Sequence, residues 1–146
     1  MDINKIQDAI IQRFENLTER VSRFKYFRHL IRLGMRASQS IEPTERNEQI
    51  VVHGTKNKIW LKAYCENGKV FFRTDSENAV SKGIAGLLSK VFSGHTPKEI
   101  INSNLYFLHE INLYDRLNTV WVKEVQAIMQ KMKSLAIGFR AASFSV

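Results

Sequence analysis

The chain has 146 residues, the usual size of one domain, and 22 Lys and Arg against 14 Asp and Glu give it a net charge of +8. Such an excess first suggests nucleic acid or anionic lipid as a partner, but the basic residues form no tail or block along the sequence, which argues against a nucleic-acid function. No apolar run is long enough to span a bilayer and no signal peptide is evident at the start, so we predict a cytoplasmic protein that does not insert into membranes.

Residues 1–37 have the apolar spacing of helices. The first stretch has apolar residues every three or four positions: Ile3, Ile6, Ile10, Phe14, Leu17, Val21 and Phe24. A second stretch runs through Phe27, Leu30, Ile31 and Leu33. Gly34 is typical of a helix end, because glycine accepts a left-handed turn. The stretches are one helix or two helices joined near Asn16–Thr18. The region is basic and amphipathic, which fits a membrane-surface helix, but packing against a core is the favoured interpretation.

Residues 38–49 are polar, contain Pro43 and predict an exposed loop. The sheet is then expected within residues 48–74, where the apolar period changes to two. This pattern predicts three antiparallel strands at Gln49–His53, Lys58–Cys65 and Lys69–Arg73. The last two strands flank Asn67-Gly68, a strong hairpin signal because both residues tolerate positive φ.

Residues 76–137 predict helices, and residues 138–146 a frayed tail. Asp75 and Ser76 are candidate caps of the next helix, and Gly94 marks its end. The sequence from Thr96 to Glu99 has the pattern of a capping box. The expected buried faces are Val80, Ile84, Leu87, Leu88 and Val91, then Leu105, Leu108, Ile111 and Leu113, and finally Val122, Val125, Met129, Met132 and Ala136. The whole sequence therefore predicts one α/β domain of the α+β type over residues 1–146.

No motif for nucleotide binding or metal-dependent hydrolysis is present, and we predict neither a cofactor nor a metal site. The four histidines are scattered and pair with no cysteine at metal-ligand spacing: His29, His53, His95 and His109. Cys65 is the only cysteine in the sequence, so no intrachain disulfide can form. In the predicted strand Cys65 falls on the same face as the apolar residues, and this position favours a buried, inert thiol over a reactive one.

Four segments in register resemble the SufE family over roughly residues 20–137. They are HLIRLG at 29–34, HGTKNKIW at 53–60, DSENAVSKGI at 75–84 and FSGHTPKEI at 92–100. The resemblance implies a small antiparallel sheet packed against helices. It also implies a protein that docks on a cysteine desulfurase, takes sulfur from the enzyme's persulfide onto its own loop cysteine, and delivers it to iron–sulfur cluster assembly. The pyridoxal phosphate of this reaction belongs to the desulfurase.

Two positions depart from the family pattern. By the anchors Gly54 and Trp60, Thr55 stands where the family carries its acceptor cysteine. Residues 117–124, LNTVWVKE, align with a stretch that holds a signature arginine, and Trp121 falls at that position. The resemblance thus implies a degenerate homologue whose scaffold is retained.

Our leading hypothesis is a non-catalytic SufE-like protein that binds a cysteine desulfurase or another sulfur-transfer protein. Its contact surface would include Gly54, Thr55, Lys56, Trp60 and Trp121. One alternative is an active sulfur acceptor that uses Cys65 instead. The other is a repurposed module that binds nucleic acid or an unrelated protein.

Overall fold

The protein is described by a computed structural model that covers residues 2–15, 17, 21–37 and 40–144. In chain order its elements are α1 (Ile3–Phe14), α2 (Arg23–Ala37), β1 (Ile59–Glu66), β2 (Lys69–Ser76), α3 (Ala79–Phe92), α4 (Pro97–Ile101), α5 (Phe107–Glu110), α6 (Leu113–Arg116) and α7 (Thr119–Phe144). The α+β class and the small antiparallel sheet are confirmed. The N-terminal region forms two helices, and the expected join near Asn16–Thr18 lies partly outside the described residues.

The sheet is a two-stranded hairpin, so the first of the three predicted strands, Gln49–His53, is wrong, whereas the other two form β1 and β2. Within Gln49–His53 only Val51 bridges β1, opposite Trp60. The residues just before it form a 3-10 turn, Glu48–Ile50, which the Asn47 side chain caps by accepting a hydrogen bond from the Gln49 amide at 2.8 Å. This local side-chain bond competes with strand pairing, which is why the alternating pattern fails there.

The hairpin itself is as predicted. Its register runs from Ile59 opposite Ser76 to Glu66 opposite Lys69. Asn67 and Gly68 both have positive φ, 53° and 76°, as a two-residue turn of this kind requires.

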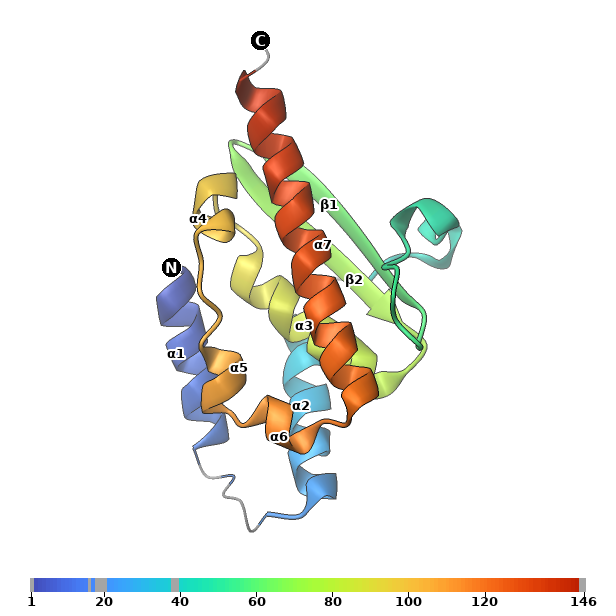
Figure 1. Cartoon of the computed structure of the whole chain (residues 1–146), viewed down its shortest axis with the longest axis vertical. Coiled ribbons are helices and arrows are strands. Elements are labelled where there is room, and N and C mark those ends of the chain that lie inside the picture. Colours follow the sequence, from blue (N-terminus) through green and yellow to red (C-terminus); the bar gives the residue numbers. More distant parts are fainter. Residues whose placement is uncertain (1, 16, 18–20, 38–39, 145–146) are drawn as a thin grey trace.

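Helix α3 is the central element. Ten of its fourteen residues are buried, because it contacts α2 on one side and β2 on another, with α7 and α1 also against it (Figure 1). The predicted face of α3 is confirmed at Ile84, Leu87, Leu88 and Val91, each 2% exposed or less. Helix α3 lies between two layers. The N-terminal helices α1 and α2 form one layer, and the hairpin and α7 form the other.

Gly34 does not end a helix, as we expected, because α2 continues to Ala37. It lies instead at the crossing of α2 and α3. A Cβ atom at Gly34 would lie 2.0 Å from the backbone oxygen of Gly83 and 2.4 Å from its Cα. Glycine is therefore required here by the close approach of two backbones, and not by a left-handed turn.

The expected cap of α3 is also wrong. Asn78 caps the helix, with its side-chain oxygen accepting from the Ser81 amide at 3.0 Å. Asp75 lies within β2, where its buried carboxylate pairs with Arg46 at 2.8 Å and Lys82 at 3.4 Å. Ser76 is likewise a strand residue.

The capping box of α4 is confirmed. The hydroxyl of Thr96 accepts from the Glu99 amide at 3.2 Å, and the Glu99 carboxylate accepts from the Thr96 amide at 3.3 Å.

The predicted tail is wrong for residues 138–144, since α7 continues to Phe144, and residues 145–146 lie outside the described part of the chain. No proline interrupts this stretch, and Ala141 and Ala142 favour the helix. The buried stripe of α7 is also slightly rotated from the predicted one. Val125, Ile128, Met132 and Ala136 are fully buried, whereas two predicted members of the stripe, Val122 and Met129, are only half-buried.

The predicted face of the first stretch is confirmed for Ile3, Ile10 and Phe14, which are at most 7% exposed. It is wrong for Phe24, which is 73% exposed. Because α1 and α2 are separate helices, the spacing that continues across both does not keep one face.

Candidate functional site

The loop of residues 53–58 connects the Val51 bridge to β1 and carries three of the predicted site residues. Gly54 has a φ of 87° and is exposed, and Lys56 is also exposed. Thr55 is half-buried, and its hydroxyl donates to the backbone oxygen of Asn57 at 2.7 Å. The Thr55 hydroxyl therefore forms a hydrogen bond within the loop and does not point to solvent as a free group.

The loop is anchored by Glu124, a residue that the sequence reasoning missed. This side chain lies in α7, is fully buried and accepts three hydrogen bonds. The Asn57 amide and side-chain nitrogen donate to Oε1 at 3.2 and 2.7 Å, and the Ser81 hydroxyl donates to Oε2 at 2.6 Å. The carboxylate thus ties the loop to α3 and α7, with hydrogen bonds to the anion compensating its burial.

A signal for Glu124 exists in the sequence. It precedes Ile128 by four residues and so falls on the buried stripe that continues through Met132 and Ala136. A carboxylate on a buried stripe needs hydrogen-bond donors to compensate its burial, and Asn57 supplies two of them. Periodicity alone does not reveal a donor that lies 67 residues away.

Trp121 lies one turn before Glu124, at the start of α7. Its backbone amide donates to the side-chain oxygen of Asn118 at 3.2 Å. The half-buried indole packs against Phe27 of α2, with ring centroids 5.8 Å apart. Trp121 and the loop of residues 53–58 therefore occupy the same end of the hairpin layer, both connected through the first turns of α7.

Trp60 lies in β1, two residues after the loop, and the Lys58 amino group of the loop is 5.9 Å from the centroid of its ring. Its side chain is on the outer face of β1 and only 6% exposed. The guanidinium of Arg46 lies over the ring at 4.6 Å and is held there by Asp75. The Trp60 ring is thus covered by the segment before the sheet and offers little free surface.

Cys65 is exposed, so the predicted burial of this thiol is wrong. It keeps the parity of Ile59 and Leu61, but β1 extends beyond the core at its hairpin end, and Ala63 is already half-buried. At about 3.3 Å per residue, the strand separates Ile59 from Cys65 by about 20 Å. The thiol therefore lies at the opposite end of β1 from Thr55.

The described residues contain no group of three or more His, Cys, Asp or Glu side chains placed to hold a metal ion. Two of the histidines bond to the backbone: the ring of His29 lies 2.6 Å from the Arg13 oxygen, and that of His95 3.1 Å from the Phe92 oxygen. Within the described part of the chain, no helix is long and apolar enough to cross a membrane.

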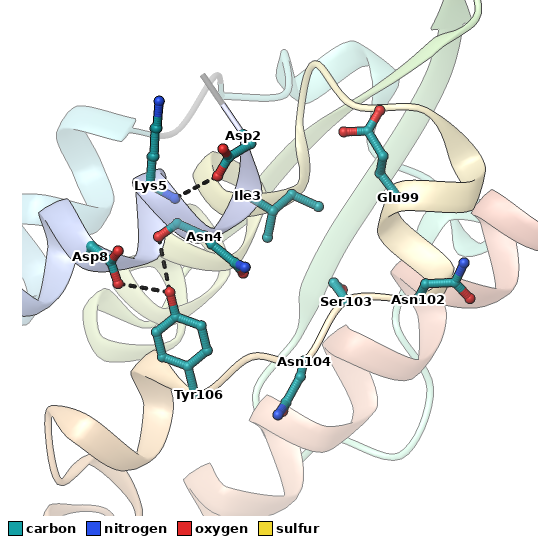
Figure 2. A pocket seen from close by; sticks show the side chains of 10 residues that line it. All are labelled: Asp2, Ile3, Asn4, Lys5, Asp8, Glu99, Asn102, Ser103, Asn104 and Tyr106. Atoms are coloured by element: carbon teal, nitrogen blue, oxygen red, sulfur yellow. Dashed lines mark hydrogen bonds between the residues drawn. The ribbon is translucent and has the colours of Figure 1, made fainter.

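A polar cleft of about 600 Å³ lies between the start of α1 and the segment after α4 (Figure 2). Tyr106 closes one side of it, because its hydroxyl donates to the Asn4 backbone oxygen at 3.0 Å and to the Asp8 carboxylate at 2.7 Å. Burial, reinforced by the hydrogen bond to Asp8, raises the pKa of Tyr106 to about 12. None of the predicted site residues lines this cleft.

Comparison with known proteins assigns the family. Residues 8–136 match the model of SufE, the Fe-S metabolism associated domain. The chain belongs to the SufE family. The match includes the loop of residues 53–58, its anchor Glu124 and Trp121, so the geometry described above is that of a SufE-family protein.

Three curated relatives are similar to this chain, and two of them are SufE-like proteins by name. An uncharacterized SufE-like protein of Synechocystis is 27% identical over 134 residues, covering 90% of this chain and 80% of the relative. The chloroplastic SufE-like protein 2 of Arabidopsis thaliana is 24% identical over 86% of this chain and 50% of its own length. The chloroplastic quinolinate synthase of Arabidopsis thaliana is 29% identical over 86% of this chain, which spans only 18% of that protein.

A solved structure supports the fold. The solution structure of a hypothetical protein from Thermus thermophilus superposes with a TM-score of 0.73, at 19% identity, over 99% of this chain and 100% of that one. The SufE-family chain therefore shares its whole architecture with an experimentally determined protein.

Proposed function

We propose that this SufE-family protein binds a cysteine desulfurase, or another sulfur-transfer protein, as a regulator or scaffold without carrying sulfur itself. The family places it in iron–sulfur and sulfur metabolism. The observation that carries the proposal is the Thr55 hydroxyl in the loop of residues 53–58, engaged with the Asn57 backbone oxygen. By the anchors Gly54 and Trp60, this is the position that holds the acceptor cysteine in the family.

A hydroxyl cannot perform the transfer. In a persulfide transfer the acceptor thiolate attacks the outer sulfur of the donor persulfide. A new S–S bond forms on the acceptor, and the old S–S bond breaks with the donor thiolate leaving, so no oxidant or reductant is consumed. A thiol ionises near pKa 8.5 and supplies the thiolate, whereas an aliphatic alcohol stays protonated at neutral pH. Thr55 therefore offers a hydrogen-bond donor but no sulfur acceptor.

The loop is held in place by residues outside it. Glu124 binds both nitrogens of Asn57 and fixes the loop against α3 and α7. Gly54 and Lys56 remain exposed on it, and Trp121 lies one turn away along α7. A regulator or scaffold needs a surface that binds the partner but does not need the acceptor thiol. Trp60 would act through the packing of Arg46 and not as a direct contact.

The test combines a binding titration with a measurement of the intact mass of this chain. Titration of the protein into a cysteine desulfurase of the same organism should give a saturable binding isotherm. After incubation of the complex with cysteine, the intact mass of this chain should stay unchanged. The absence of any binding to the desulfurases of the host would refute the proposal.

The exposure of Cys65 favours a second candidate function, an active acceptor with a relocated thiol. A chain that gains the mass of one sulfur, and loses that gain on Cys65→Ser, would establish it. The distance of about 20 Å along β1 between the loop and Cys65 argues for the non-carrying role, because one docking geometry does not bring both ends of the strand to one donor sulfur. A cytoplasmic location stays a prediction, since two relatives are chloroplastic proteins by name.

A further inference from the structure

Helix α2 has a second apolar face in addition to the one that packs on α3. Tyr26, Leu30 and Gly34 are buried against the core. On the other side, four apolar residues follow one another at helical spacing and remain partly or fully accessible: Phe24, Phe27, Ile31 and Met35. We call these four residues the outer strip. Phe24 is 73% exposed and Met35 50%, which are large values for apolar side chains that gather in one stripe.

The outer strip is surrounded by positive charge. Helix α2 contains no acidic residue, and its basic residues are Arg23, Lys25, Arg28, Arg32 and Arg36. All five are exposed. Within the described part of the chain, no carboxylate forms a salt bridge with any of them. The face therefore combines apolar contact area with cationic groups whose charge is not neutralised by the protein.

The outer strip also encloses a groove. Phe24, Phe27 and Ile31 form its apolar walls, and Arg28 and Arg32 stand beside them, around a volume of about 440 Å³. A space of this size accepts a few side chains of an inserted segment. It is a shallow depression on the surface of α2, bordered by both apolar and cationic side chains.

The outer strip also contacts the first turn of α7. Phe27 contacts the ring of Trp121. Trp121 lies one turn before Glu124, which holds Asn57 and with it the loop of residues 53–58. The N-terminal turns of α2 and α7 thus form one side of the molecule, at the lower end of the view in Figure 1.

We propose that the outer strip docks an acidic amphipathic helix of the partner, with apolar side chains of that helix in the groove and its carboxylates against Arg28 and Arg32. Charge complementarity selects this occupant. A second copy of this chain would bring the same basic helix to the face and be repelled. The inference rests on the proposed function, because it identifies which surface contributes most of the affinity for the cysteine desulfurase.

The first test is calorimetric titration of a host cysteine desulfurase with Phe24→Ala. Phe24 is an exposed aromatic wall of the groove, and an aromatic side chain that the bound helix buries is a typical hot spot, so the dissociation constant should rise about tenfold. Ile137→Ala is the matched control, since Ile137 is a 54% exposed apolar residue of α7 outside the groove, and its dissociation constant should stay within about twofold of wild type. Both side chains are exposed, and circular dichroism verifies that both variants fold.

The second test reverses charge. Arg28→Glu with Arg32→Glu should lower the association rate about tenfold and reduce its dependence on salt. Lys69→Glu with Lys98→Glu makes the same change in net charge at exposed positions of the hairpin and α4, and should leave the rate near wild type.

The outcomes separate the two proposals. If wild type binds and the Phe24 and Arg28/Arg32 variants bind equally well, the docking face is wrong while the proposed function stands. If wild type binds no host desulfurase, the proposed function fails and this face loses its partner. Loss of binding to phosphatidylserine vesicles on Phe24→Ala, with desulfurase binding unchanged, would show a membrane contact and would also overturn the inference.

Discussion

Replacement of Glu124 by alanine tests whether the docking loop is held by α7. The carboxylate accepts from the Asn57 amide, the Asn57 side chain and the Ser81 hydroxyl. Each hydrogen bond to a charged acceptor contributes about 1.5–3 kcal/mol net. The full sum does not apply, because both bonds to Asn57 are only partly buried and water can replace Glu124 there. We expect Glu124→Ala to lower the free energy of unfolding by about 2–4 kcal/mol.

Two further variants make this prediction specific. Glu124→Gln keeps the volume and an oxygen that accepts from Asn57, and its amide can donate to the Ser81 hydroxyl, so the loss should be about 1 kcal/mol. Glu110→Ala removes an exposed carboxylate from α5 and should change stability by less than about 0.5 kcal/mol.

The assay is urea unfolding, combined with hydrogen exchange of the Asn57 amide. In Glu124→Ala this amide should lose its protection, because its acceptor is gone, whereas amides within β1 should keep theirs. Unfolding free energies of Glu124→Ala and Glu110→Ala that agree within error, or an Asn57 amide equally protected in both, would refute the anchoring role.

Three other changes check the fold and the site. Gly34→Ala should destabilise the protein by about 1–3 kcal/mol in urea unfolding, since its Cβ meets the Gly83 backbone at 2.0 Å; Gly138→Ala, which has no neighbour within 4 Å, should be neutral or stabilising, and equal behaviour of the two would contradict the close crossing. Cys65 is exposed and should react with iodoacetamide in the native protein as fast as after unfolding; a much slower native rate would mean that the thiol is covered. Thr96→Ala should cost about 1 kcal/mol by loss of the capping box and leave desulfurase binding unchanged, and a stable Thr96 variant that no longer binds would show a functional role.

Local signals in the sequence were sufficient for much of the fold. The Asn67-Gly68 turn and the Thr96 capping box are defined within a few residues, and both form as predicted. The predicted strand at Gln49–His53 does not form, because Asn47 caps a 3-10 turn in competition with strand pairing. Gly34 was misinterpreted because its role depends on Gly83, which meets it only when α2 and α3 cross.

The candidate site was predicted less completely. The family resemblance located the loop with Thr55 and the position of Trp121. It did not identify Asn57 and Glu124, whose contact joins segments 67 residues apart. The distribution of charge along the sequence also concealed the basic face of α2, because residues 1–40 contain four acidic residues, none of which lies in α2.

The central claim is that the protein binds a sulfur-transfer partner through the loop of residues 53–58 and lacks the acceptor thiol there. The most direct measurement is the intact mass of wild type and of Thr55→Cys after incubation with a host cysteine desulfurase and cysteine. Thr55 is half-buried in a loop whose anchor does not involve its methyl group, so the fold should tolerate the change. We predict an unchanged mass for wild type and the addition of one sulfur to Thr55→Cys. Sulfur on wild type that disappears with Cys65→Ser, or a folded Thr55→Cys that binds the enzyme and gains none, would contradict the account.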